Sequence, residues 1–380
     1  MSMSLPPPPQ VWPGVPSPAP RLVELARELG DGVRVEGDAQ VRIYGVRHDS
    51  RRVQEGDLFY ARRGRTSDGL RFAEDAVASG ARAVLAGEGE RRAADLGVPV
   101  LVATDPARAF ARMADAVYGH PSFSLETVGV TGTNGKTTVS HLVRDAIDGA
   151  LGLPRCGLVG TVGHSFAGFA LEAEHTTPEA DEIARVLAAF RHRGATHVAM
   201  EVSSIALALG RVDAVRFRVA VFTNLTQDHL DFHGSMAAYG EAKASLFEAH
   251  GPGAAVVHVD DAFGNDLARR VRAPLLRVSS KVGAGGADVF PTAVSDGGEG
   301  IALEVSTPAG PVAFRSPLRG GHNVDNLLLA LATALALELG VARAAAALAA
   351  SRGAPGRLER CDEPGDGVQV LVDYAHTPDA

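Results

Sequence analysis

A glycine-rich turn between a strand and a helix constrains the fold of this chain more than any other stretch. Residues 127–131 are mostly β-branched, which is typical of a buried strand. Residues 139–147 carry apolar side chains at helical spacing, which predicts a helix. The turn consists of Gly132, Thr133, Asn134, Gly135, Lys136, Thr137 and Thr138.

A strand, such a turn and a helix N-terminus together predict a site for nucleotide phosphates. Backbone N–H groups point inward, the helix dipole is positive there, Lys136 adds a point charge, and Thr137 can hold Mg²⁺. The general pattern G-x-x-x-x-G-K-[ST] requires glycine where this chain has Val130, so only the shorter form G-x-x-G-K-T-T is present. The alternative is an ordinary strand-to-helix turn with a surface lysine.

Composition limits the class of protein. The chain has 380 residues, 46% of them hydrophobic, which is enough for two or three domains with their own cores. A net charge of −8 argues against nucleic acid as the main partner. Two cysteines cannot build a disulfide framework, and no stretch resembles a transmembrane helix or a signal peptide. We therefore expect a cytoplasmic monomer without membrane insertion.

Lysine is rare in this chain, and its positions are informative. Of the 37 basic residues only Lys136, Lys243 and Lys281 are lysines. A compact ammonium in the phosphate turn is not well replaced by a guanidinium. The same reasoning draws attention to Lys243, although chance is the alternative with so few lysines.

The regions before the turn predict a tail and a small α/β domain. Residues 1–20 are Pro-rich and predict a disordered tail. Residues 21–122 predict the domain. Its expected strands are 41–46, 58–61, 83–86 and 98–102, and its expected helices are 21–29, 72–79 and 106–118.

Residues 123–353 predict a central domain that contains the phosphate turn. Apolar strands that alternate with helices indicate a doubly wound, mostly parallel sheet, in which ligands bind beyond the carboxyl ends of the strands. Glu201 and Asn224 lie at such ends. Further strands are expected at 157–160, 197–202, 219–224, 255–259 and 275–278, helices at 179–193 and 236–248, a β-rich insertion at 287–316, and a helix pair at 324–351.

The pattern restarts near Gly353. Residues 368–373 predict a strand, and residues 354–380 therefore predict the start of a third, Rossmann-like α/β domain. The fold class is α/β throughout, with a P-loop ATPase domain in the centre.

Several further segments follow the phosphate turn in a fixed order, and the series closely resembles the Mur ligases. These are the ATP-dependent amide-forming ligases of peptidoglycan precursor synthesis. Glu-Val-Ser-Ser from Glu201 and the N-terminal Asp49-Ser50-Arg51 favour the MurE-type member. The segments after the turn are 175–178, 201–204, 223–233, 239–243, 321–326, 355–357 and 373–379.

The resemblance implies a reaction and its substrates. ATP would phosphorylate a carboxylate of UDP-N-acetylmuramoyl-L-alanyl-D-glutamate, and a diamino acid would displace the phosphate to form an amide. The amine is expected to be meso-diaminopimelate, with L-lysine as the alternative. It also implies that residues 21–122 bind the UDP-substrate, that residues 123–353 bind ATP, and that residues 354–380 begin the ligase domain that closes on ATP.

The resemblance assigns roles around ATP and Mg²⁺. Lys136 and the turn would hold the phosphates, with Thr137 and Glu201 on one Mg²⁺ and His229 on a second. Lys243 matches a carbamylated lysine that binds metal, against the alternative of a solvated helix lysine. We expect Lys136, Glu201, His229 and Lys243 to be catalytic. The nucleotide would also contact Asn323, Asn326, Arg357 and Asp373, although Asn323 could simply be a helix N-cap.

The resemblance also places the nucleotide-sugar substrate. A short loop of hydroxyls with an arginine suits a diphosphate sugar, although a polar surface loop is the alternative. The residues expected at the uridine diphosphate are His48, Ser50, Arg65, Thr66 and Ser67, and those expected at the muramoyl-dipeptide are His175, Thr176, Thr177, Ser203 and Arg211.

Three positions depart from the family pattern near the dipeptide. His175 stands where the family often has asparagine, Ile205 where it often has histidine, and Leu209 where it often has glutamine. Each change puts a substrate contact in doubt but leaves the ATP chemistry intact.

Two other interpretations remain open from the sequence. One is a MurF-type or other Mur-like ligase. The other is a nucleotide-binding protein without ligase activity, because the third domain is largely absent from this chain. We accordingly expect residues 1–380 to bind the UDP-substrate and to ligate poorly by themselves.

Overall fold

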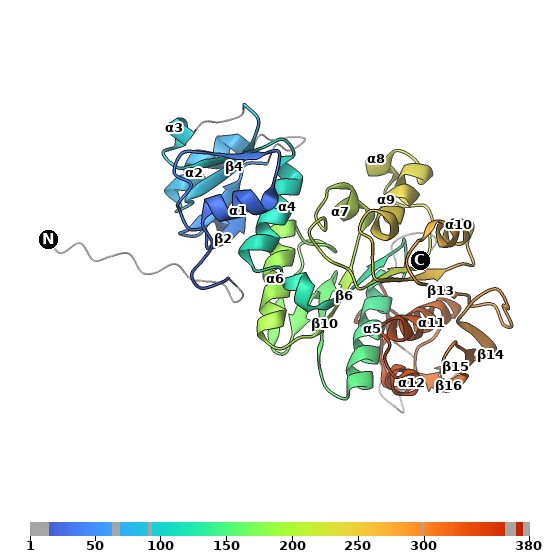
Figure 1. The fold of residues 1–380 in the computed structure, drawn as a ribbon. Coiled ribbons are helices and arrows are strands. Elements are labelled where there is room, and N and C mark those ends of the chain that lie inside the picture. Colours follow the sequence, from blue (N-terminus) through green and yellow to red (C-terminus); the bar gives the residue numbers. More distant parts are fainter. Residues whose placement is uncertain (1–14, 63–68, 90–92, 298–299, 362–369, 375–380) are drawn as a thin grey trace. The chain divides into compact units, whose positions relative to one another are not determined.

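The computed structural model describes residues 15–62, 69–89, 93–297, 300–361 and 370–374 (Figure 1). The chain folds into two compact units. The first unit contains residues up to Ser124 together with Glu179–His192 and Leu209–Val215, and the second contains Leu125–Pro178, Arg193–Ala208 and the residues from Arg216 onward.

The first unit is built on a five-stranded sheet in the order β1-β5-β4-β3-β2. The strands are parallel except β1, which pairs antiparallel with β5. The strands are β1 (Val33–Glu36), β2 (Gly45–Arg47), β3 (Asp57–Tyr60), β4 (Ala83–Gly87) and β5 (Val100–Ala103), and the helices include α1 (Leu22–Leu29), α2 (Ala73–Ala78), α3 (Ala93–Leu96), α4 (Pro106–Val117) and α6 (Ala180–His192).

Both faces of this sheet are buried. Leu58 and Leu85 point into the cluster that contains α1 and α4, whereas Phe59 and Val84 point into the cluster on the opposite face. This alternation along each strand is the expected consequence of a side-chain period of two. The strand predicted at 41–46 is shorter and begins at Gly45.

Helix α6 belongs to the first unit, although the order of the sequence predicts it beside the central sheet. Its alanines at 180, 184 and 188 lie in the same buried cluster as Ala109 and Phe110 of α4. A row of small residues at a spacing of four allows a close approach between two helices. Side-chain size therefore explains this packing better than chain order does.

The second unit is built on an eight-stranded sheet in the order β13-β12-β11-β6-β10-β7-β8-β9. The strands from β13 to β7 are parallel, and β8 and β9 extend the sheet as an antiparallel hairpin. The predicted mostly parallel α/β sheet is thus confirmed. The strands are β6 (Glu126–Thr131), β7 (Cys156–Gly160), β8 (Gly163–Phe166), β9 (Phe169–Leu171), β10 (His197–Glu201), β11 (Val219–Phe222), β12 (Ala254–His258) and β13 (Leu275–Val278).

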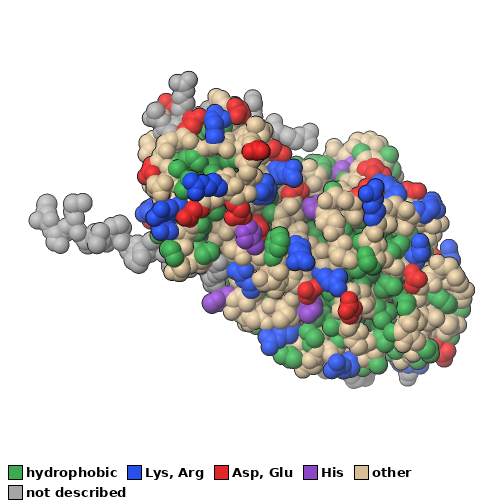
Figure 2. Space-filling view, in the orientation of Figure 1, with side chains coloured by type: hydrophobic (Ala, Val, Ile, Leu, Met, Phe, Trp, Pro, Cys, Tyr) green, Lys and Arg blue, Asp and Glu red, His purple; other side chains and the backbone are tan. Residues whose placement is uncertain are grey.

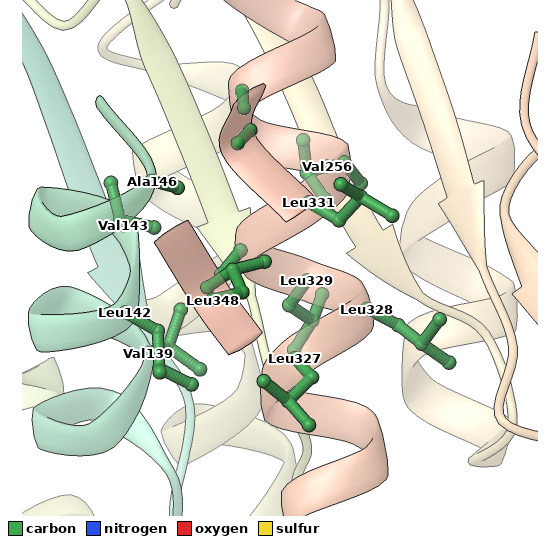
Figure 3. Close-up of a cluster of buried hydrophobic side chains, with 14 of the residues drawn as sticks. Val139, Leu142, Val143, Ala146, Val256, Leu327, Leu328, Leu329, Leu331 and Leu348 are labelled. Carbon is green, nitrogen blue, oxygen red and sulfur yellow. The ribbon is translucent and has the colours of Figure 1, made fainter. Parts of the chain in front are cut away.

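Helices pack against that sheet and against one another. Side chains of α5, α11 and α12 form one buried cluster, in which Val139, Leu142 and Val143 of α5 lie near Leu327 and Leu348 (Figure 3). The helices of this unit are α5 (Lys136–Leu151), α7 (Ser204–Ala208), α8 (Leu230–His233), α9 (Met236–Glu248), α10 (Ala262–Arg270), α11 (Gly321–Ala336) and α12 (Val341–Ala350).

Two smaller sheets complete the second unit. The predicted β-rich insertion forms an antiparallel sheet of β14 (Phe290–Gly297), β15 (Gly300–Ser306) and β16 (Val312–Ser316). Near the end of the chain, β17 (Glu359–Arg360) pairs with β18 (Leu371–Val372).

The surface carries charges of both signs. Acidic and basic side chains are interspersed over the face shown in Figure 2. Across the described ranges, no helix is both long enough and apolar enough to cross a membrane.

Candidate active site

The glycine-rich turn lies between the carboxyl end of β6 and the first turn of α5, as its sequence predicts. Gly135 is the N-cap of α5 and has φ +86°, a conformation that side chains disfavour. A Cβ at Gly135 would also lie 2.7 Å from Asn326 Oδ1. Gly132 has φ +150°, and a Cβ there would collide with Thr223 Oγ1. Both glycines are therefore required by the shape of the turn.

Lys136 folds back over the turn. Its Nζ donates to the carbonyl oxygens of Gly132 at 3.0 Å and Thr133 at 2.8 Å. Burial lowers the pKa of Lys136, while the charges of Glu201 and Asp228 counteract that shift. A desolvated ammonium that is hydrogen-bonded to neutral carbonyls is well placed to bind an anionic phosphate.

The carboxyl end of β11 holds the turn from the other side. Asn224 Oδ1 accepts from the backbone N–H of Asn134 at 3.0 Å, and its Nδ2 donates to Asn134 O at 3.2 Å. The hydroxyl of Thr223 donates to the same carbonyl at 2.6 Å. Asn224 was expected at a strand end that faces ligand, and its contacts give it a role in rigidifying the phosphate turn.

Glu201 ends β10 beside the first turn of α5. Its carboxylate accepts from Thr137 Oγ1 at 2.9 Å and from the backbone N–H of Thr161 at 2.7 Å. Burial raises the pKa of Glu201, and the contacts with Thr161, Lys136 and Thr137 oppose that shift. Gly160 permits this placement, because a Cβ there would collide with Glu201 Oε1. Thr161 was not singled out in the sequence, since an isolated hydroxyl residue after a strand carries no motif.

Lys243 is buried in α9 with a relative exposure of 1%. Its Nζ donates to Gly132 O at 2.7 Å and lies 4.3 Å from the centre of the Tyr239 ring. Burial and the nearby charge of Lys136 lower the pKa of Lys243 well below its ordinary value. The alternative of a solvated helix lysine is therefore wrong, and the amine reaches the same carbonyl as Lys136.

His229 lies on the connection after β11 and has φ +51°, an uncommon backbone conformation for histidine. Its Nε2 is 3.5 Å from Asp228 Oδ2, and its ring is 6.2 Å from that of Tyr239. The Tyr239 ring is therefore a neighbour of both the His229 ring and the Lys243 amine. Strain in this region of backbone is common at functional sites.

All of the predicted nucleotide residues except Gly132 line one cavity of about 370 Å³ within the second unit. Its walls come from the turn, the carboxyl ends of β10 and β11, the start of α11, and the segment from Arg357. Of the predicted ATP and metal residues, the cavity is lined by Thr133, Asn134, Gly135, Lys136, Thr137, Thr138, Glu201, His229, Asn323, Asn326, Arg357 and Asp373.

The two asparagines of α11 lie side by side in this wall. Asn326 Nδ2 donates to Asn323 Oδ1 at 2.9 Å, and Asn323 Nδ2 donates to Arg319 O at 2.7 Å. Gly320 is the N-cap of α11, so Asn323 lies inside the helix and the N-cap alternative is wrong. The remaining acceptor, Asn326 Oδ1, faces Gly135 of the phosphate turn.

Arg357 and Asp373 form the far wall. The guanidinium carbon of Arg357 lies 4.9 Å from the centre of the Tyr374 ring. Asp373 Oδ1 accepts from the backbone N–H groups of Leu358 at 3.2 Å and Tyr374 at 3.0 Å. Asp373 therefore ties together the two segments that carry Arg357 and Tyr374. His376, which belongs to the same sequence motif, lies outside the described residues.

The donors near the turn fit one divalent cation better than two. Thr137 Oγ1 and the Glu201 carboxylate are adjacent hard oxygen ligands, as Mg²⁺ prefers. In contrast, an unmodified Lys243 offers only a hydrogen-bond donor. Among the residues that the structure describes, no cluster of three or more His, Cys, Asp or Glu side chains could hold a metal ion. A carbamate formed on Lys243 would add oxygen ligands for a second cation near His229.

The predicted substrate residues are divided between the two units. In the second unit, Thr177 Oγ1 accepts from the backbone N–H of Ser203 at 2.9 Å and lies 2.9 Å from Glu201 O. Thr176 Oγ1 is 3.1 Å from Thr161 Oγ1, which joins it to the Glu201 network. His175 is exposed.

In the first unit, His48 and Arg211 both pair with acidic residues at the start of α6. His48 Nδ1 is 2.9 Å from Asp181 Oδ1, and Arg211 Nη2 is 2.7 Å from Glu179 Oε1. Ser50 begins a short 3-10 helix, Ser50–Arg52. The three predicted loop residues Arg65, Thr66 and Ser67 lie outside the described residues.

Comparisons with known proteins find related sequences. The model of the Mur ligase middle domain matches residues 130–334, and that of the Mur ligase family, catalytic domain, matches residues 42–119. UDP-N-acetylmuramoyl-L-alanyl-D-glutamate–2,6-diaminopimelate ligase of Gloeobacter violaceus is 43% identical over 363 residues, which are 95% of this chain and 72% of that protein. The ligase of the same name from Streptomyces coelicolor is 42% identical, over 97% of this chain and 72% of that protein.

A solved structure is similar as well. A structure of UDP-N-acetylmuramoyl-L-alanyl-D-glutamate–2,6-diaminopimelate ligase superimposes with a TM-score of 0.78 and 30% identity. The alignment covers 95% of this chain and 72% of that one.

Proposed function

The chain belongs to the Mur ligase family, and from this premise we propose that it joins diaminopimelate to UDP-N-acetylmuramoyl-L-alanyl-D-glutamate with the use of ATP. The observation that carries the proposal is the phosphate turn whose Lys136 and Thr137 lie beside the buried carboxylate of Glu201. The names of the relatives that are 43% and 42% identical favour diaminopimelate as the amine and favour the MurE-type reaction over the MurF-type.

The reaction requires an activated carboxyl group, because a carboxylate does not react with an amine at neutral pH. A carboxylate oxygen of the substrate attacks the γ-phosphorus of ATP, the bond to the β-phosphate oxygen breaks, and ADP leaves. The amine nitrogen then attacks the acyl carbon, inorganic phosphate leaves, and the amine loses a proton. Phosphoryl transfer of this kind depends mainly on positioning and on neutralisation of charge.

The residues of the turn supply both the positioning and the neutralisation of charge. The N–H groups at the start of α5 and the Lys136 ammonium would hold the phosphates, and Asn224 keeps the turn rigid. Thr137 and Glu201 would hold Mg²⁺, which neutralises phosphate charge when bound. Asn323 and Asn326 would contact the adenine, and Arg357 and Asp373 would close on the nucleotide.

His229 and Lys243 would complete the site on the substrate side of the phosphates. The buried amine of Lys243 is suited to react with carbon dioxide, because a neutral amine is the nucleophile in that reaction. The resulting carbamate would supply oxygen ligands that the free amine lacks. The residues proposed to contact the nucleotide-sugar substrate are His48, Ser50, His175, Thr176, Thr177, Ser203, Arg211 and the loop at 65–67.

The proposal is tested by the release of phosphate from ATP. Release that requires both the UDP-muramoyl-dipeptide and diaminopimelate supports it. Release only with the UDP-muramoyl-tripeptide and D-alanyl-D-alanine would assign the chain to the MurF-type reaction. If the chain binds nucleotide but releases no phosphate in response to either set of substrates, it is a nucleotide-binding protein without ligase activity.

A further inference from the structure

Cationic side chains gather around two buried carboxylates at the start of α6, entirely within the first unit. Glu179 pairs with Arg62 and Arg211, and Asp181 pairs with His48. These partners come from distant parts of the sequence, namely the connections after β2 and β3 and the segment after α7. No sequence motif singles out Arg62, Glu179 or Asp181.

Glu179 is shared by two guanidinium groups. Its Oε1 lies 2.7 Å from Arg211 Nη2, and its Oε2 lies 3.1 Å from Arg62 Nη1. Burial alone would raise the pKa of Glu179, but the charges of Arg211, Arg62 and His48 lower it, so the carboxylate is ionised at neutral pH. Each carboxylate oxygen is therefore committed to a different arginine.

The two arginines differ in their access to solvent. The Arg211 side chain is 12% exposed and the Arg62 side chain is 43% exposed, while Glu179 beneath them is 9% exposed. The Arg62, Arg211 and Glu179 side chains together carry one net positive charge, and the neighbouring Asp181 carboxylate pairs with His48 and with Arg185. The planar guanidinium of Arg62 contacts Glu179 through Nη1 and is partly exposed, so it can present N–H groups in a fixed direction to a carboxylate or a phosphate.

A purely structural role explains this arrangement poorly. Burying a carboxylate costs more free energy than a surface ion pair returns, so a contribution to stability is a weak explanation for this cluster. Arg211 is already expected at the muramoyl-dipeptide, and His48 at the uridine diphosphate. Arg62 lies in the same network and was not expected at either.

We propose that Arg62 binds an anionic group of the nucleotide-sugar substrate together with Arg211, and that Glu179 is the positioning residue that orients both guanidinium groups. This inference rests on the proposed function. The shared chemistry is a bidentate anion, which is either the diphosphate of the uridine nucleotide or a carboxylate of the dipeptide.

Calorimetric titration of the chain with two ligands separates these sources. Arg62→Ala is expected to weaken binding of UDP-N-acetylmuramoyl-L-alanyl-D-glutamate by about tenfold, the usual effect of losing one charge-assisted hydrogen bond. Equal weakening of UDP binding would identify the diphosphate, and unchanged UDP binding would identify a carboxylate. Arg82→Ala is the matched control, because Arg82 pairs with Glu55 on the surface of the same unit.

The titration of the wild type distinguishes failure of the Arg62 proposal from failure of the proposed function. If the wild-type chain binds the substrate and Arg62→Ala binds both ligands within about twofold of it, the role of Arg62 is overturned while the proposed function stands. If the wild-type chain binds neither ligand, the proposed function fails and this inference fails with it.

Glu179 is tested by charge removal and by conservative replacement. Glu179→Gln should weaken substrate binding about tenfold, and Glu179→Asp should restore part of it, because Asp keeps the charge on a shorter arm. In the Arg62→Ala background the effect of Glu179→Gln should be smaller, since the two residues then no longer act on each other. Tighter binding by Glu179→Gln would overturn the positioning role, because the carboxylate would then merely compete with the substrate. Glu55→Gln is the control, and unfolding midpoints by circular dichroism establish that each variant folds.

Discussion

The hydroxyl of Thr137 donates to Glu201 Oε2 at 2.9 Å, which joins the first turn of α5 to the carboxyl end of β10. The two residues are 64 positions apart in the chain. The pair places two oxygen ligands for a hard cation directly beside the phosphate turn. The residues proposed to hold the nucleotide and its cation therefore gather where β6 and β10 lie next to each other in the parallel sheet.

Replacing Thr137 by Val should remove the dependence of nucleotide binding on magnesium. In the wild type we expect ADP to bind more tightly with Mg²⁺ than with a chelator, because a cation held by Thr137 and Glu201 would neutralise phosphate charge. In Thr137→Val the two affinities should become similar, whereas Thr137→Ser keeps the hydroxyl and should behave like the wild type. Fluorescence titration with a labelled ADP measures the ratio. A magnesium effect of wild-type size in Thr137→Val would contradict the assignment.

Lys136→Met should reduce the affinity for ADP by at least about tenfold, since a charge-assisted contact with a phosphate is lost. The fold should persist, because Lys136 Nζ donates to two carbonyls of the turn itself. Lys281→Met is the control, because the Lys281 side chain is 71% exposed. Equal affinities of the two variants would count against a phosphate role for Lys136.

Lys243 should carry a carbamate in the presence of bicarbonate. A chain equilibrated with isotope-labelled bicarbonate is expected to give a carbamate carbon resonance in NMR spectra, and Lys243→Arg should lack it, since a guanidinium is not carbamylated. The basis is the burial of an amine whose pKa lies well below its ordinary value. A wild-type spectrum without that resonance, or one that persists in Lys243→Arg, would refute the modification.

Asp57 should impose a pH dependence on stability. Burial raises the pKa of Asp57 to about 6. The charge of Arg47, whose Nε lies 3.3 Å from Asp57 Oδ2, opposes the shift. Between pH of about 4 and about 6 the folded state keeps a proton that the unfolded chain releases, so the free energy of unfolding falls as the pH rises, by up to about 3 kcal/mol. Asp57→Asn should lose this decline.

The free energy of unfolding of the wild type and of Asp57→Asn is measured by urea unfolding at pH of about 4 and about 6.5. The exposed carboxylate variant Glu55→Gln should retain the wild-type pH dependence. An identical decline in Asp57→Asn and in the wild type would show that another group is responsible.

Much of the fold could be predicted because its signals are local. The helix expected at 236–248 is α9 with the same bounds, and the β-rich insertion expected at 287–316 contains β14 to β16. The hairpin of β8 and β9 was missed. Its turn has positive φ at Ala167 (47°) and Gly168 (79°), and Ala-Gly lacks the Asn-Gly or Asp-Gly signature of such turns.

The residues of the candidate site also fall into those that local sequence signals predict and those that they do not. The phosphate turn is contiguous, so its geometry follows from the sequence. Thr161 and Glu179 could not be found by such reasoning, because each is distinguished only by contacts with residues from other elements, Glu201 in one case and Arg62 with Arg211 in the other. A single hydroxyl or carboxylate has no sequence pattern that distinguishes it from the many polar residues on the surface.

The most direct test of the central claim is the identity of the product. The chain is incubated with ATP, Mg²⁺, UDP-N-acetylmuramoyl-L-alanyl-D-glutamate and an equimolar mixture of diaminopimelate, lysine and D-alanyl-D-alanine, and the nucleotide products are weighed by mass spectrometry. We predict that the UDP-muramoyl-tripeptide that is formed, however small its yield, contains diaminopimelate and forms only when ATP is present. A product that contains another amine, or amide formation without ATP, would contradict it.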